Sequence, residues 1–104
     1  MTIANVHGVA RGFKVLQTGS KSQTAVMVLS PGEASSEEEN VHEKSDQILL
    51  VIKGNVQAGI GKEERLMREG DVCLIPAGTP HRFENKSSRP AITFNVYSPP
   101  EYPA

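Results

Sequence analysis

The chain has 104 residues, which is the material of a single domain, because two separate cores would each be too small to be stable. Hydrophobic residues at 38% and charged residues at 22% are typical of a globular chain and exclude a disordered or fibrous one. The 11 Lys and Arg are balanced by 12 Asp and Glu, so the sequence lacks the basic excess of a nucleic-acid-binding protein.

Short β-branched and apolar runs begin after an N-terminal arm, residues 1–12. Residues 13–19 and 24–30 predict the first two strands, which are separated by a polar stretch. Residues 31–41 are acidic and turn-forming and have no apolar period, so they predict a solvated loop.

The next strand, residues 47–53, is apolar on both of its faces. Side chains alternate between the two faces of a strand, and here the even-numbered and the odd-numbered positions both carry aliphatic residues. Such a strand must be covered on both sides. Either another subunit or the N-terminal strands supply the second cover, and we expect a homodimer.

The remaining chain alternates strands with turns. Seven or eight short strands, turn signals every eight to twelve residues and no helical period predict an all-β sandwich or barrel. The tail, residues 98–104, holds three prolines and is expected to lie extended over the surface. The later predicted strands cover residues 56–60, 65–71, 72–76, 81–85 and 91–97.

A turn between two of these strands carries the most specific motif of the chain. Gly70, Pro76, Gly78, His81 and Asn85 have the spacing G-x5-P-x-G-x2-H-x3-N. The proline ends one strand, a glycine permits the turn, and the histidine opens the returning strand. This segment resembles the second conserved motif of the cupin superfamily at all five positions.

The first cupin motif is represented only in part. Gln47 stands at the position of the usual glutamate, and the histidine pair is incomplete. If four residues separate the second histidine position from Gln47, His42 takes that position and Asn40 the first one. If two residues separate them, Lys44 takes the second position and His42 the first. The spacing H-x4-Q resembles the variant found in small bacterial single-domain cupins.

The resemblance implies a cupin-type double-stranded β-helix, a jelly-roll barrel that forms one domain over residues 1–104. It also implies a divalent metal ion held by His42, His81 and Gln47, with Asn40 as a possible further ligand. Zn, Fe, Ni, Mn and Cu all remain open as the ion. The alternative is a pair of structural histidines in a barrel that has lost its metal.

Four other side chains are candidates for the interior of the barrel. Lys44 shares the strand parity of His42 and is either a solvated lysine or a catalytic acid, base or anion anchor. Phe83, Phe94 and Val96 are expected to fill the core or to line the pocket.

These features predict a metal-binding cupin that binds a small polar molecule in its cavity. Whether it is an enzyme stays open: oxygenation and isomerisation both occur among the proteins it resembles. The alternatives are a non-catalytic sensor or carrier and a partner subunit with a vestigial cavity. No carboxylate pair or nucleophile and base pairing supports a glycosidase or covalent mechanism.

Two further features of the sequence predict the cellular compartment of the protein. No apolar run approaches the roughly 20 residues that span a bilayer, and the N-terminus lacks the pattern of a signal peptide. Cys73 is the only cysteine, which excludes an internal disulfide, and its strand position predicts burial. We therefore expect a cytoplasmic protein that meets neither membranes nor nucleic acid.

Overall fold

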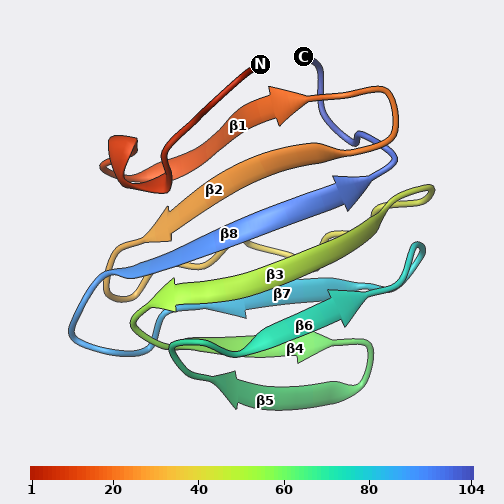
Figure 1. Cartoon of the computed structure of the whole chain (residues 1–104). Helices are drawn as coiled ribbons and strands as arrows, with labels where there is room; N and C mark the ends of the chain where they lie inside the picture. Colours follow the sequence, from red (N-terminus) through yellow and green to blue (C-terminus); the bar gives the residue numbers. More distant parts are fainter.

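Eight antiparallel strands form two sheets in the computed structural model, which describes all 104 residues (Figure 1). The larger sheet has the order β1-β2-β8-β3-β6 and the smaller one the order β5-β4-β7. The predicted all-β jelly-roll fold is confirmed. The strands are β1 (Gly12–Thr18), β2 (Gln23–Leu29), β3 (Asp46–Lys53), β4 (Val56–Ile60), β5 (Glu63–Met67), β6 (Val72–Ile75), β7 (His81–Glu84) and β8 (Ala91–Ser98).

The inner faces of both sheets supply the hydrophobic core. Leu49 and Val51 of β3 are at most 1% exposed, as are Val56 of β4 and Phe83 of β7. Each such side chain contributes roughly 1.5–3 kcal/mol when it is removed from water. Gly54 closes the turn between β3 and β4 with a φ of 79°, and an added Cβ would lie 2.7 Å from the Pro90 carbonyl oxygen. Only glycine fits this position without displacing the backbone.

The acidic segment between β2 and β3 is bound to the smaller sheet. The backbone N–H of Asn40 donates to the His81 carbonyl, and the N–H of His81 donates to the Asn40 carbonyl. Ala34 forms a second bridge, to Glu84. Residues 31–41 form a loop without buried residues, as predicted, and these two bridges fasten the loop to β7.

The segment after β8 folds back over one end of the barrel and is fixed there by buried side chains. We call residues 99–102 the C-terminal strap. Gln23 of β2, which is 1% exposed, accepts from the backbone N–H groups of Glu101 and Tyr102 and donates to the Tyr102 carbonyl. The Ser45 hydroxyl donates to the Pro99 carbonyl at 2.7 Å. The tail is thus held over the barrel opening by specific hydrogen bonds.

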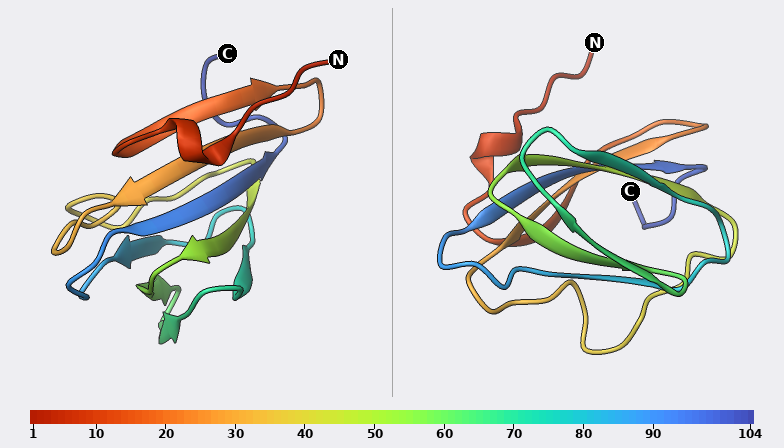
Figure 2. Two further views of the ribbon diagram at one scale, coloured as in Figure 1. Left: turned by 60° about the vertical axis from the view of Figure 1, so that its left-hand side comes forward. Right: turned by 90° about the horizontal axis from the view of Figure 1, so that it is seen from below.

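The N-terminal residues lie on the β1 side of the larger sheet, and their end leads away from the barrel (Figure 2). The Thr2 carbonyl accepts from the Gln17 side chain at 3.0 Å. The helical structure of the chain is limited to one 3-10 turn, Val6–Gly8, and a single turn is far shorter than a bilayer-spanning helix.

Candidate metal and ligand site

Two imidazoles meet inside the barrel, below the C-terminal strap. The ring centres of His42 and His81 are 4.9 Å apart, and the residues are 7% and 3% exposed. Imidazoles that share one ion at metal–nitrogen distances of roughly 2.0–2.1 Å have ring centres about 5 Å apart. The two histidines that the sequence places 39 positions apart are therefore at the separation that a common ion requires.

The turn of the second motif brings these histidines together. Gly78 has a φ of 81°, a conformation that favours glycine, and its N–H donates to the His42 carbonyl at 2.8 Å. Asn85, the last residue of the motif, is fully buried, and its side-chain amide donates to the Leu29 and Arg89 carbonyls. Asn85 therefore fastens the β7–β8 loop to β2 and has no part in the site.

The protonation of His81 is determined by its backbone partner. His81 Nδ1 lies 2.9 Å from the Thr79 carbonyl oxygen, which can only accept. Nδ1 consequently carries the proton, and Nε2 keeps a free lone pair. Burial lowers the pKa of His81, so the ring is neutral at physiological pH and able to bind an ion.

A chain of hydrogen bonds fixes the orientation of the Gln47 amide. The Thr93 hydroxyl donates to the Met27 carbonyl, so Thr93 Oγ1 accepts from Asn95 Nδ2. Asn95 Oδ1 then accepts from Gln47 Nε2 at 2.9 Å. Gln47 Oε1 is left buried and without any partner. A buried acceptor without a partner is costly, so this oxygen is directed toward a donor or a cation.

The cavity around these groups has a volume of about 90 Å³. A water molecule occupies roughly 30 Å³ in the liquid, so the space fits an ion with two or three small ligand atoms. Burial raises the pKa values of the Tyr97 and Tyr102 hydroxyls, which both stay protonated at physiological pH. The lining residues are Phe13, Met27, Ser35, Asn40, His42, Gln47, His81, Phe83, Tyr97 and Tyr102.

Three of the predicted pocket or catalytic residues do not reach this cavity. Phe94 and Val96 alternate with the inward-facing Asn95 and Tyr97 along β8, so they lie on the opposite face of the sheet. Lys44 is exposed in the bend before β3 and is not among the lining residues. The pocket prediction for Phe94 and Val96 is wrong, because β8 could not be assigned an inner face without its partners. Lys44 takes the solvated alternative, because the chain bends directly after His42.

Two cavity residues that sequence reasoning missed come from the ends of the chain. Tyr102 of the C-terminal strap lies 6.0 Å, between ring centres, from His42, and Phe13 of β1 lies 4.8 Å from Tyr102. Neighbouring Glu101 places its carboxylate oxygen 3.3 Å from His42 Nδ1. The proline content of the tail predicted an extended segment but gave no sign that it returns to the site.

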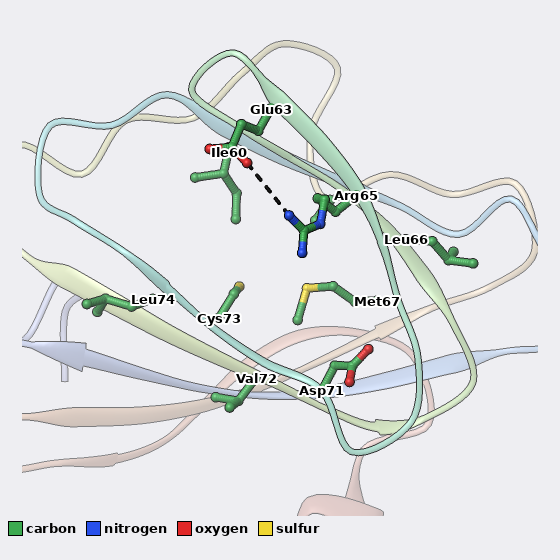
Figure 3. Close-up of a pocket in the computed structure, with 10 residues that line it drawn as sticks. Ile60, Glu63, Arg65, Leu66, Met67, Asp71, Val72, Cys73 and Leu74 are labelled. Atoms are coloured by element: carbon green, nitrogen blue, oxygen red, sulfur yellow. Dashed lines mark ion pairs between the residues drawn. The ribbon is translucent and has the colours of Figure 1, made fainter.

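A larger cavity of about 440 Å³ lies between the β4–β5 hairpin and β6 (Figure 3). Seven of its ten lining residues are hydrophobic, and its charged groups already have partners. Arg65 pairs with Glu63 at 4.0 Å, and the Asp71 carboxylate accepts from the Arg68 N–H. Without an unpartnered polar group, this cavity has no feature that selects a ligand.

Cys73 lies in the wall of the larger cavity and packs against the core, but it is only partly buried. Burial raises the pKa of its thiol to about 11. We therefore expect slow alkylation at pH 8 in the native protein, faster alkylation in denaturant, and a native rate that rises with pH up to about 11. A native rate equal to the denatured one would contradict this, and mass spectrometry of the alkylated chain measures both.

The fold and the paired histidines define a small β-barrel with a candidate ligand site inside it. The cupin domain model matches residues 25–97, and the chain belongs to the cupin family. It is 32% identical over 94 residues to the uncharacterized protein L612 of Acanthamoeba polyphaga mimivirus, covering 86% of this chain and 58% of that protein.

Two further proteins extend this comparison. The crystal structure of TT1209 from Thermus thermophilus superposes with a TM-score of 0.83 at 30% identity, over 95% of this chain and 98% of that one. The quercetin 2,3-dioxygenase of Bacillus subtilis is 33% identical over 64 residues, which are 62% of this chain and 19% of the enzyme. The chain thus spans 58% of its viral relative and a fifth of its enzymatic one.

The residues present can be tested against the metal ion that the family implies. No group of three His, Cys, Asp or Glu side chains converges in the structure. The available donors are two imidazoles and the unpartnered Gln47 Oε1, an N,N,O set that zinc and neighbouring transition metals accept. The donor set fits a divalent ion but contains no anionic ligand.

Proposed function

We propose that this cupin binds a divalent metal ion through His42, His81 and Gln47, and a small polar molecule beside the ion. The observation that carries the proposal is the buried Gln47 Oε1, which has no partner although its orientation is imposed by three successive hydrogen bonds. A cation next to two imidazoles satisfies this oxygen and explains why the chain maintains its orientation.

The chemistry of the site follows from the residues around the ion. A bound divalent ion with open positions supplies Lewis-acid or dioxygen chemistry, for oxygenation or isomerisation. The aromatic rings of Tyr97, Tyr102 and Phe13 exclude bulk water, and the two protonated tyrosines offer hydrogen bonds to a polar ligand. The relationship to a dioxygenase supports oxygenation. The volume of about 90 Å³ favours a ligand well below drug size.

Metal analysis of protein purified without a polyhistidine tag tests the proposal. We expect one divalent ion per chain, loss of that ion on dialysis against a chelator, and recovery with Zn, Fe, Ni, Mn or Cu. The proposal is wrong if the chain holds less than a tenth of an equivalent of each metal and if none of these metals changes its melting temperature.

The second candidate function is non-catalytic binding of a small ligand. It is favoured by the lining of the cavity, which contains no carboxylate, lysine or histidine to move a proton at physiological pH apart from the two proposed metal ligands, His42 and His81. Oxygen uptake that depends on added Fe(II) supports the oxygenase. A ligand that raises the melting temperature and is recovered unchanged supports the carrier.

A homodimer is also part of our proposal, and the outer face of the larger sheet supports it. Ile48, Val72 and Leu74 are 42%, 62% and 57% exposed, and Ile48 pairs directly with Leu74 across β3 and β6. Val26 and Val28, on the outer face of β2, are at most 4% exposed. The apolar outer face of β3 and β6 therefore lacks a cover, and an exposed apolar patch of this kind is typical of a protein–protein interface.

We expect a dimer by light scattering at micromolar concentration. Leu74→Lys should give a monomer, because it introduces a charge into this apolar face. Leu66→Lys is the matched control: Leu66 is 46% exposed on the smaller sheet, and its replacement should leave the dimer intact. A monomeric wild type, or a dimeric Leu74→Lys variant, would disprove this interface.

A further inference from the structure

The carboxylate nearest to the paired histidines belongs to the C-terminal strap. Glu101 Oε2 lies 3.3 Å from His42 Nδ1, and the two side chains are 27% and 9% exposed. The contact is therefore largely shielded from water, where the electrostatic attraction between a carboxylate and an N–H group is stronger than at the surface.

The position of Glu101 is determined by the hydrogen bonds of the strap backbone. Its N–H donates to Gln23 Oε1 at 3.0 Å, and the next N–H, of Tyr102, donates to the same oxygen at 2.9 Å. Gln23 Nε2 donates to the Tyr102 carbonyl and to the Thr18 hydroxyl. All hydrogen-bonding groups of one buried glutamine are thus used to hold the backbone on which Glu101 stands.

The contact favours one position for the proton of His42. A carboxylate oxygen 3.3 Å from Nδ1 attracts an N–H group and repels a nitrogen lone pair, so it favours the tautomer with the proton on Nδ1. Nε2 then keeps its lone pair, as it does in His81 through the Thr79 carbonyl. A backbone carbonyl hydrogen-bonded to His81 and a carboxylate of the tail close to His42 thus favour a free Nε2 in both rings.

The negative charge also matters, because the first motif has a neutral Gln47 where a glutamate is usual. The three candidate ligands carry no charge, so nothing among them offsets that of a divalent ion. A carboxylate on the far nitrogen of a metal-binding histidine fixes the ring and raises its basicity.

We propose that Glu101 is a positioning residue, which holds His42 with Nε2 free for an ion and supplies from the tail the negative charge that the first motif lacks. This inference rests on the proposed metal-binding function. It assigns to the C-terminal strap a part in the site in addition to covering it.

Zinc affinity of the full chain, measured by competition with a chelating dye, tests the proposal. Glu101→Ala should weaken zinc binding by about 10-fold to 100-fold, the usual effect of removing such a partner. Glu101→Gln keeps a neutral acceptor and should lie between Glu101→Ala and the wild type. Glu43→Ala is the matched control, since Glu43 is an exposed acid next to His42 in the chain that forms no ion pair with it, and it should stay close to the wild type.

The tautomer of His42, read from imidazole 15N shifts in the metal-free protein at pH 8, is the second measurement. We expect the Nδ1–H form in the wild type and in Glu101→Gln, and a mixture in Glu101→Ala. If the wild type binds zinc and Glu101→Ala matches it in affinity and tautomer, Glu101 has no positioning role and the metal proposal stands. If the wild type binds no metal, the metal proposal fails, and an unchanged tautomer in Glu101→Ala then overturns the positioning role as well.

Discussion

Replacing either cavity histidine by alanine will abolish stoichiometric metal binding. His42→Ala and His81→Ala each remove one of only two imidazole donors, and the remaining imidazole and amide oxygen do not make a site of useful affinity. We expect affinity to fall by at least about 100-fold, or about 2.8 kcal/mol, with the β circular-dichroism signal retained.

The third histidine of the chain provides the control. His7 is exposed in the 3-10 turn, so His7→Ala should bind metal as the wild type does. Equal metal content in the two cavity variants and the wild type, by mass spectrometry of the dialysed protein, would remove both histidines from the site.

Gln47→Glu will have opposite effects on the metal-free and the metal-bound protein. Beside an ion, the new charge adds an anionic ligand, and we expect a net gain on the order of 1–3 kcal/mol, roughly 5-fold to 100-fold in affinity. Without the ion, the carboxylate faces Asn95 Oδ1. Turning the Asn95 amide only transfers the conflict to Thr93, whose hydroxyl would have to abandon the Met27 carbonyl. The metal-free variant should therefore lose about 1–3 kcal/mol of its free energy of unfolding.

The pH dependence of that loss identifies its cause. Burial raises the pKa of the new carboxyl above its unfolded value of about 4.3. The loss should thus be small near pH 4, where the protonated carboxyl can donate to Asn95, and should grow as the pH rises through the folded pKa. Gln57→Glu, the same change on the outward face of β4, should leave the metal affinity unchanged. If the chelator competition curve and the unfolding curve of Gln47→Glu both overlay those of the wild type, Gln47 lies outside the site.

The strands could be predicted because each one has a local signal. Residues 56–60 were predicted with the observed bounds of β4, and β8 differs from its prediction, residues 91–97, by one residue. β5 was placed too late, since the turn was expected at Glu63 and Glu64, which the structure places in the strand. Charged residues are common in turns, but at an exposed sheet edge they also serve as strand residues.

The site could be predicted only as far as its motifs extend. His81 follows from a complete local pattern, and the structure brings it to His42, Asn40 and Gln47. Glu101 could not be foreseen, because its position depends on the amide of Gln23 on a distant strand. The faces of β8 were likewise undetermined: β2 and β3 flank it on both sides, so its apolar residues lie inside and outside the barrel.

The position of β8 also determines when the barrel can fold during synthesis. The last strand of the chain lies in the middle of the larger sheet, with β2 on one side and β3 on the other. While the ribosome is still synthesising β8, those two strands have no partner between them and their core faces are open to water. The sheet therefore closes only after synthesis of β8, and fragments that end before it should aggregate instead of forming a smaller barrel.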